Sequence, residues 1–185
     1  MTFEYWLATC VIMVPGILYA SWVDYKDRRV PNWLNAAIAA AGFAAQGWYN
    51  HGLSGVGTGA LGLLVGFAVL ILPWLMHGMG AGDVKLMMAI GVWLGPALTL
   101  YSFLVGALAG GVIAVVMIVS SGRIWNAWAN MATIMCKVTN RSTIFSEFAS
   151  ARSFGDTSQL LPYGVPLTIG TLVVFFAQLA LMQTA

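Results

Sequence analysis

Two acidic residues stand where an ionised side chain is costly. The sequence has six acidic residues, and only Asp24 and Asp83 stand at ends of apolar runs on what the charge pattern predicts to be the same side of a membrane. Acidic groups at such places are rare and usually functional. Two neighbouring carboxyl groups resist simultaneous ionisation, so the pair shares one proton near neutral or mildly acidic pH. The ionised member can then activate a water while the neutral member hydrogen-bonds a carbonyl, which is the chemistry of aspartic-type peptide hydrolysis.

Other catalytic and metal-binding arrangements have little support in the sequence. The two histidines, His51 and His77, are far apart and are predicted on opposite sides of the membrane. No His-x-x-x-His or Cys-x-x-Cys pattern occurs, so we expect neither a metal site nor a cofactor. Gly-x-Ser-x-Gly is also missing from the sequence. The few basic residues form no long stripe, so binding of nucleic acid is not predicted.

The chain that must position the two aspartates is unusually apolar. Of its 185 residues, 60% are hydrophobic and 8% are charged, whereas soluble domains carry about 25% charged residues. We therefore predict an all-α integral membrane protein that forms a single domain over residues 1–185. A membrane span needs about 20 apolar residues. About six transmembrane helices are expected from the apolar stretches 5–23, 33–50, 53–76, 83–95, 97–119 and 162–182.

The basic residues predict how these helices are oriented. If the first helix starts outside, then residues 24–32, 77–83 and 120–161 face the cytoplasm. All eight basic residues then lie on that side or in the first turn from it, as the positive-inside rule requires. Both termini are predicted to face the periplasm or the cell exterior, with the two aspartates toward the cytoplasm.

The fourth apolar stretch is too short to cross the membrane alone. Residues 83–95 make about 20 Å of helix, whereas the hydrocarbon layer is about 30 Å thick. If Gly95 and Pro96 form the outer turn, Asp83 lies below the inner membrane surface and follows a glycine-rich segment over residues 77–82. Irregular backbone at that depth is tolerated beside protein or a water-filled cavity.

The segment 120–161 is predicted to be a cytoplasmic loop with an amphipathic helix. Ile124, Trp128, Met131 and Met135 recur at helical spacing, which predicts a helix lying flat in the membrane interface. Residues 138–161 are rich in serine and threonine, and we expect them to form a mobile cover over the site.

Three motifs resemble those of the type IV prepilin peptidases. Asp24, followed seven residues on by Pro31 and Asn32, resembles their first aspartate motif. The segment Gly80-Ala81-Gly82-Asp83-Val84-Lys85-Leu86 is similar to the second, Gly-x-Gly-Asp-x-Lys-Leu, and Pro162-Tyr163-Gly164 is similar to a Pro-Tyr/Phe-Gly element. The resemblance implies that Asp24 and Asp83 are catalytic. It implies that the following residues bind substrate or shape the site: Gly80, Gly82, Lys85, Pro31, Asn32, Pro162, Tyr163 and Gly164.

The resemblance also implies a substrate and a location. Members of this family are aspartyl endopeptidases of the bacterial inner membrane that cut after a glycine at the end of a basic prepilin leader, at the cytoplasmic face and without a cofactor. The expected partners are the prepilin, the lipid bilayer and the pilus-assembly machinery. Long members carry an additional N-terminal part with a cysteine tetrad, linked to N-methylation. This chain resembles the short form of tight-adherence (Flp-type) pilus systems, so N-methylation is not expected.

Simpler interpretations of the same residues stay open at this point. Asp83 is in a position to cap a helix, and Asp24 to pair with Arg28 four residues on. Gly80 and Gly82 are also typical of a simple turn, and Lys85 of a side chain that extends to the membrane surface. Two other functions stay open as well: a small transporter or proton channel that uses the acids as relays, and a non-enzymatic scaffold of a secretion complex.

Overall fold

The computed structural model describes residues 3–27, 30–50, 52–75, 79–120 and 163–184. The chain divides into two compact units, Met1–Gly110 with Pro162–Ala185, and Gly111–Leu161. The described residues contain helices and no strand, which confirms the all-α prediction for this part of the chain. The predicted amphipathic helix, the predicted cover over 138–161 and Pro162 lie outside the described residues.

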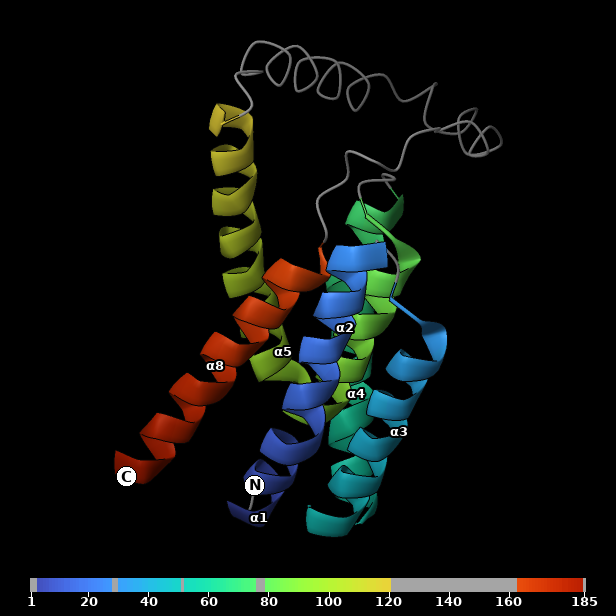
Figure 1. Cartoon of the computed structure of the whole chain (residues 1–185). Helices are drawn as coiled ribbons and strands as arrows, with labels where there is room; N and C mark the ends of the chain where they lie inside the picture. The colour runs from blue at the N-terminus through green and yellow to red at the C-terminus, as the bar shows by residue number, and fades with distance from the viewer. Residues whose placement is uncertain (1–2, 28–29, 51, 76–78, 121–162, 185) are drawn as a thin grey trace. The chain divides into compact units, whose positions relative to one another are not determined.

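The first helical rod runs from Phe3 to Asp27 in three parts, which are α1 (Phe3–Ala8), a π-helical turn η1 (Thr9–Met13) and α2 (Val14–Asp27). Pro31 then stands in an extended conformation as the N-cap of α3 (Asn32–Tyr49). Proline suits this place because its ring fixes φ and it has no N–H group to leave unpaired. The second helix thus begins within one residue of the apolar stretch 33–50 that the sequence predicts. The remaining helices are α4 (Leu53–Leu75), α5 (Ala81–Ser120) and α8 (Gly164–Thr184) (Figure 1).

Helix α5 joins the fourth and fifth predicted stretches and is interrupted at Gly95. This residue has φ 72° and ψ 176°, a conformation that glycine adopts at little cost and other residues rarely do. Before the interruption, Gly91 lies against Gly62 of α4, and after it Gly106 lies against Pro166 of α8. Gly95 therefore turns the chain so that the two halves of α5 pack against different neighbours.

Four helices among the described residues are long and apolar enough to cross a membrane, which supports a membrane protein. Helix α3 has 18 residues but is not among them, since alanine and polar residues such as Asn35 and Gln46 make up much of it. Helix α5 counts once because its two halves follow one another directly at Gly95. The number of six crossings thus stays a prediction. The four segments are Glu4–Asp27, Leu53–Leu75, Ala81–Met117 and Gly164–Met182.

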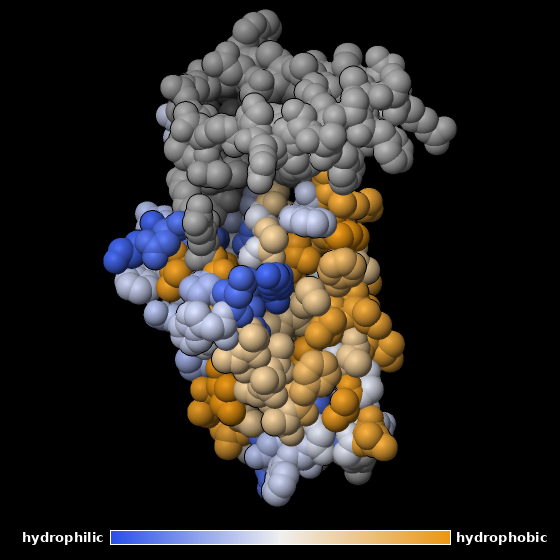
Figure 2. All heavy atoms as spheres, turned by 90° about the vertical axis from the view of Figure 1, so that its right-hand side faces the viewer, coloured by the Kyte–Doolittle hydropathy of each residue, from blue (hydrophilic) through white to orange (hydrophobic). Residues whose placement is uncertain are grey.

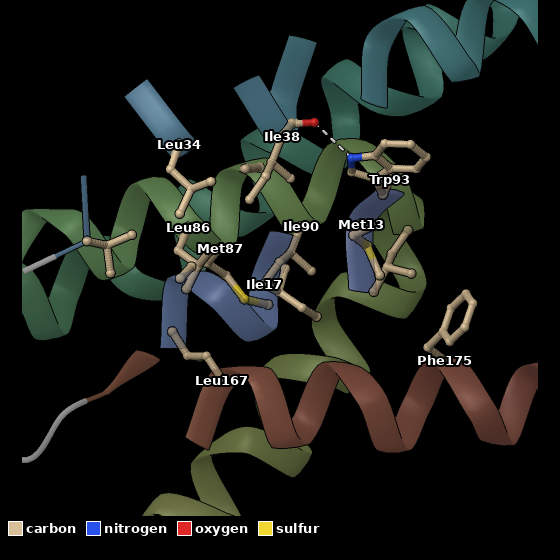
Figure 3. Packing of buried hydrophobic residues seen from close by; sticks show 14 of the residues in the cluster. Met13, Ile17, Leu34, Ile38, Leu86, Met87, Ile90, Trp93, Leu167 and Phe175 are labelled. Carbon is tan, nitrogen blue, oxygen red and sulfur yellow. Dashed lines mark hydrogen bonds between the residues drawn. The ribbon is translucent and has the colours of Figure 1, made fainter. Parts of the chain in front are cut away.

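The first half of α5 forms the centre of the hydrophobic core. Leu86, Met87, Ile90 and Trp93 are fully buried, and Figure 3 shows them surrounded by apolar side chains from the first helical rod, α3 and α8. By contrast, many large apolar side chains on the other helices are exposed, and much of the face shown in Figure 2 is apolar. A buried central helix and apolar outer surfaces are what a helix bundle in lipid requires.

Helix α4 packs on this central helix through glycines. Gly55, Gly59, Gly62 and Gly66 are buried and follow one another at intervals of three or four residues. A Cβ atom on Gly62 would lie 1.9 Å from the carbonyl oxygen of Gly91. The two backbones are thus in direct contact, as small residues permit in membrane helices.

Buried polar side chains satisfy the backbone where α5 is interrupted. Pro96 has no N–H group to offer the Val92 carbonyl four residues before it. Gln46 Nε2 donates to that carbonyl at 3.0 Å, and the Tyr5 hydroxyl donates to the next one, Trp93 O. Since unpaired carbonyls are costly in an apolar core, Gln46 and Tyr5 stabilise the turn at Gly95.

Candidate active site

Asp24 lies in the last turn of α2 and is only 5% exposed. The sequence placed it just after the first apolar stretch, but the helix continues to Asp27 and holds Asp24 within its wall. The backbone N–H of Gly164 donates to Asp24 Oδ2 at 2.9 Å. Gly164 is the first residue of α8, and the N-terminal end of a helix attracts negative charge. The N–H group and the helix end both place positive partial charge beside Asp24 Oδ2.

A second bond fixes the start of α8 beside Asp24. Ser21 lies three residues before Asp24, on the same side of α2, and its hydroxyl donates to Gly164 O at 2.9 Å. Ser21 also bonds to the hydroxyl of Thr168, one turn further along α8. The backbone of Gly164 is therefore held at both its N–H and its C=O group.

Asp83 lies in the first turn of α5 and is 6% exposed. Its Oδ2 accepts the backbone N–H of Gly80 at 3.3 Å, while its own N–H donates to Gly80 O at 3.2 Å. The first of these bonds is half of a capping box, in which a side chain at the third helical position accepts the N–H of the capping residue, so the capping interpretation of Asp83 describes one of its two oxygens. The other oxygen, Oδ1, is buried and has no hydrogen-bond partner in the described part of the chain.

The two carboxylates line one cavity of about 310 Å³, together with Val30, Asn32 and the segment Gly80, Ala81 and Gly82. They are close enough to interact electrostatically. Helices α2 and α5, distant in the sequence, thus bring both acids to the same opening. A cavity of this size beside two carboxylates can admit water and a short stretch of polypeptide backbone.

The other predicted residues frame this cavity to different degrees. Asn32 lines it and accepts a hydrogen bond from Lys85 Nζ at 2.9 Å, which ties the start of α3 to the start of α5. Both side chains are exposed, so this bond is at the rim. Pro31 contributes through its carbonyl, which accepts the N–H groups of Leu34 and Asn35 and thereby begins α3.

The three predicted glycines differ in how strictly the site needs them. A Cβ atom on Gly164 would lie 2.8 Å from Asp24 Oδ2, closer than such atoms approach in proteins. A Cβ on Gly80 would lie 3.4 Å from Asp83 Oδ2, and one on Gly82 would lie 3.4 Å from Val30, which are ordinary contact distances. Sterically, Gly80 and Gly82 fit a turn, and only Gly164 excludes a side chain.

Tyr163 stands half-buried immediately before α8. Burial, and then the negative charge of Asp83, raises the pKa of its hydroxyl above the usual value. The phenol is therefore protonated at physiological pH and available as a hydrogen-bond donor beside the acidic pair.

Sequence reasoning missed Asn35 and Ser21. Asn35 is 4% exposed in α3, and its Nδ2 donates to Gly82 O at 3.2 Å. In the sequence, Asn35 could have been noticed as an amide inside an apolar stretch, and Ser21 as a hydroxyl one helical turn before Asp24.

No group of three or more His, Cys, Asp or Glu side chains that could hold a metal ion occurs among the residues that the structure describes.

The fold and the site together define the class of this protein. It is a helical protein with membrane-spanning character, in which two buried carboxyl groups line one cavity. Residues 11–115 match the type IV leader peptidase family, and the chain belongs to this family. The match covers more than half of the chain and includes both aspartates. The role of a leader peptidase, and hence of a protease, follows from this membership. No curated protein and no solved structure was found to match the chain.

Proposed function

We propose that this leader peptidase is an aspartyl endopeptidase that removes the leader of type IV prepilins, with Asp24 and Asp83 as its catalytic pair. The observation that carries the proposal is that both carboxylates are buried and line the same cavity. Membership of the leader peptidase family supplies the class of substrate, a protein with a leader peptide. The transporter and scaffold alternatives have no comparable support.

The different surroundings of the two acids support different roles. Asp24 accepts a hydrogen bond from the Gly164 N–H at the start of α8, and it is the ionised base that takes a proton from water. Asp83 is the neutral acid, and its free Oδ1 position carries the proton that hydrogen-bonds the scissile carbonyl. The water oxygen bonds to the carbonyl carbon while Asp83 gives its proton to the carbonyl oxygen. When the C–N bond breaks, Asp24 returns its proton to the leaving amine and Asp83 regains its own.

The placement of the site supports cleavage at the cytoplasmic membrane surface. In this proposal α3 and both halves of α5 also cross the inner membrane, giving six crossings with both termini outside. An 18-residue helix is about 27 Å long, which is close to the hydrocarbon thickness. Lys26 and Lys85 are exposed near the two aspartates, in agreement with a cytoplasmic location.

A pilin helix in the bilayer would then present its leader junction, after a glycine, to the cavity. The short Flp-type prepilins are the proposed substrates.

Cleavage of a prepilin by the purified protein in liposomes tests the proposal. We expect Asp24→Asn and Asp83→Asn each to lower the cleavage rate by at least about 10³-fold, because each removes one half of the acid–base chemistry. Asp27→Asn is the matched control, since Asp27 is exposed and three residues from Asp24. It should keep nearly full activity. Full cleavage by a folded variant at either catalytic position would exclude the mechanism.

A further inference from the structure

Asn35 connects α3 to the residue that precedes Asp83. Its Nδ2 donates to Gly82 O at 3.2 Å. Only the nitrogen end of the amide can donate to a carbonyl, so this bond fixes the orientation of the side chain. A backbone carbonyl has two lone pairs, and the helical ladder of α5 uses one. The bond from Asn35 is therefore an additional link between two helices.

The backbone of Gly82 also has a neighbour in the turn between α2 and α3. A Cβ atom placed on Gly82 would lie 3.4 Å from the backbone N and O atoms of Val30. Asp24 precedes that turn and Asp83 follows Gly82 directly. The Asn35 amide thus holds the Gly82 backbone at the place where the segment after Asp24 and the segment before Asp83 lie side by side. Near the start of the two helices, the bond from Lys85 to Asn32 also links α3 and α5, but it is exposed and so contributes less.

Packing alone does not explain an asparagine at this position. Asn35 Oδ1 is buried and has no hydrogen-bond partner among the described residues. A buried acceptor without a donor lowers stability, and an apolar side chain of similar size, such as leucine, would avoid this loss. An amide kept at such a place has a use other than stabilising the fold.

We propose that Asn35 is a positioning residue of the peptidase site, whose buried amide sets the position of Asp83 relative to Asp24 by holding the Gly82 carbonyl. This inference rests on the proposed function. Asn35 bonds to Gly82, the residue before Asp83, and not to Asp83 itself. Its loss therefore affects the chemical step through the geometry of the acid pair. A misplacement of about 1 Å is enough to lower a rate by about 10²-fold.

Asn35→Leu and Gln46→Leu, compared in the full-length protein, separate positioning from packing. Both replace a buried amide that bonds to a carbonyl of α5, Asn35 at Gly82 and Gln46 at Val92 on the far side of the core. For Asn35→Leu we expect kcat for prepilin cleavage to fall at least about tenfold, KM to stay within about twofold, and Tm not to fall. For Gln46→Leu we expect a lower Tm and an unchanged kcat. An Asn35→Leu protein with wild-type kcat, or with a change in KM only, overturns the inference.

Asn35→Asp provides a second and independent measurement, and it decides the matter if Asn35→Leu does not fold. An ionised carboxylate cannot donate to Gly82 O, whereas a neutral carboxyl group can donate through its O–H. The ratio of kcat for this variant to that of the wild type should therefore rise as the pH is lowered. A ratio that stays constant with pH overturns the inference. If Asp83→Asn retains activity, the proposed function fails, and that result is distinguishable because it does not involve Asn35.

Discussion

At the scale of single residues, Gly164 is the position where the backbone itself forms part of the site. Its N–H donates to Asp24, its carbonyl accepts from Ser21, and its missing side chain leaves room for the carboxylate. The glycine is needed for the close approach and not for an unusual φ, because it begins an ordinary helix. A residue far away in the sequence thus sets the orientation of Asp24.

Gly164→Ala tests this contact. The added methyl group would lie 2.8 Å from Asp24 Oδ2 and would force the carboxylate to move, although the N–H donor remains. We expect kcat for prepilin cleavage to fall by about 10- to 100-fold. Gly57→Ala serves as the control, because nothing lies within 4 Å of that Cβ position. Equal activity of the two variants would show that the contact has no catalytic importance.

The two aspartates were predictable from the sequence and their supporting residues were not. Asp24 and Asp83 are charges at the ends of apolar runs, and such charges are conspicuous in a chain with so few. Asn35 and Ser21 act through bonds to backbone atoms of distant helices, Gly82 O and Gly164 O. Every residue has a backbone carbonyl, so the sequence does not show which carbonyl a side chain will bond. Such partners can be identified only once the helices are placed.

At the scale of helices, the glycine stripe of α4 determines how closely α4 approaches the central half of α5. The buried glycines put the backbone of Gly62 directly against that of Gly91. Close contact of this kind replaces the hydrophobic driving force that helices lack inside lipid. The half of α5 that begins with the turn of Asp83 is thereby packed directly against α4.

Gly62→Ala and Gly57→Ala should change stability in opposite directions. At Gly62 the new Cβ would lie 1.9 Å from Gly91 O, so the helices must separate, at a cost of about 3 kcal/mol. The Tm in detergent should fall by on the order of 10 °C. At Gly57, which is exposed, alanine should raise stability by about 0.5 to 1 kcal/mol because it favours the helix. A Gly62→Ala protein as stable as the wild type would contradict the packing described above.

Most helix boundaries followed from the pattern of apolar residues, and irregular features did not. The stretches 33–50 and 53–76 correspond to α3 and α4 within a residue or two. The first helix extends to Asp27 because helical hydrogen bonding continues past the apolar residues. The π-helical turn at Thr9–Met13 had no sequence signal, since it changes the backbone ladder and not the residue types.

At the scale of the whole molecule, the charge pattern predicts on which side of the membrane each turn lies. Asp27, the last residue of α2, is predicted to face the cytoplasm, whereas the turn before α4 is predicted to be external. Leu53, at the start of α4, is 90% exposed and therefore suitable for labelling. The positive-inside rule is the physical basis for this orientation.

Labelling of single cysteines in intact cells tests the orientation. In a background of Cys10→Ala and Cys136→Ala, we expect Leu53→Cys to react with a thiol reagent that does not cross the inner membrane. Asp27→Cys should react only after the membrane is made permeable. Reaction of both from the same side would contradict the proposed topology and would leave the position of the peptidase site to be reassigned.

The bond between Gly164 and Asp24 joins residues 140 positions apart. During synthesis both acids leave the ribosome long before the helix that completes their surroundings. A nascent chain that carries α2 and α5 lacks this bond, so under the proposed mechanism we expect hydrolysis to begin only after α8 is inserted. The proposed mechanism therefore implies that proteolysis is withheld until translation of the last helix is complete.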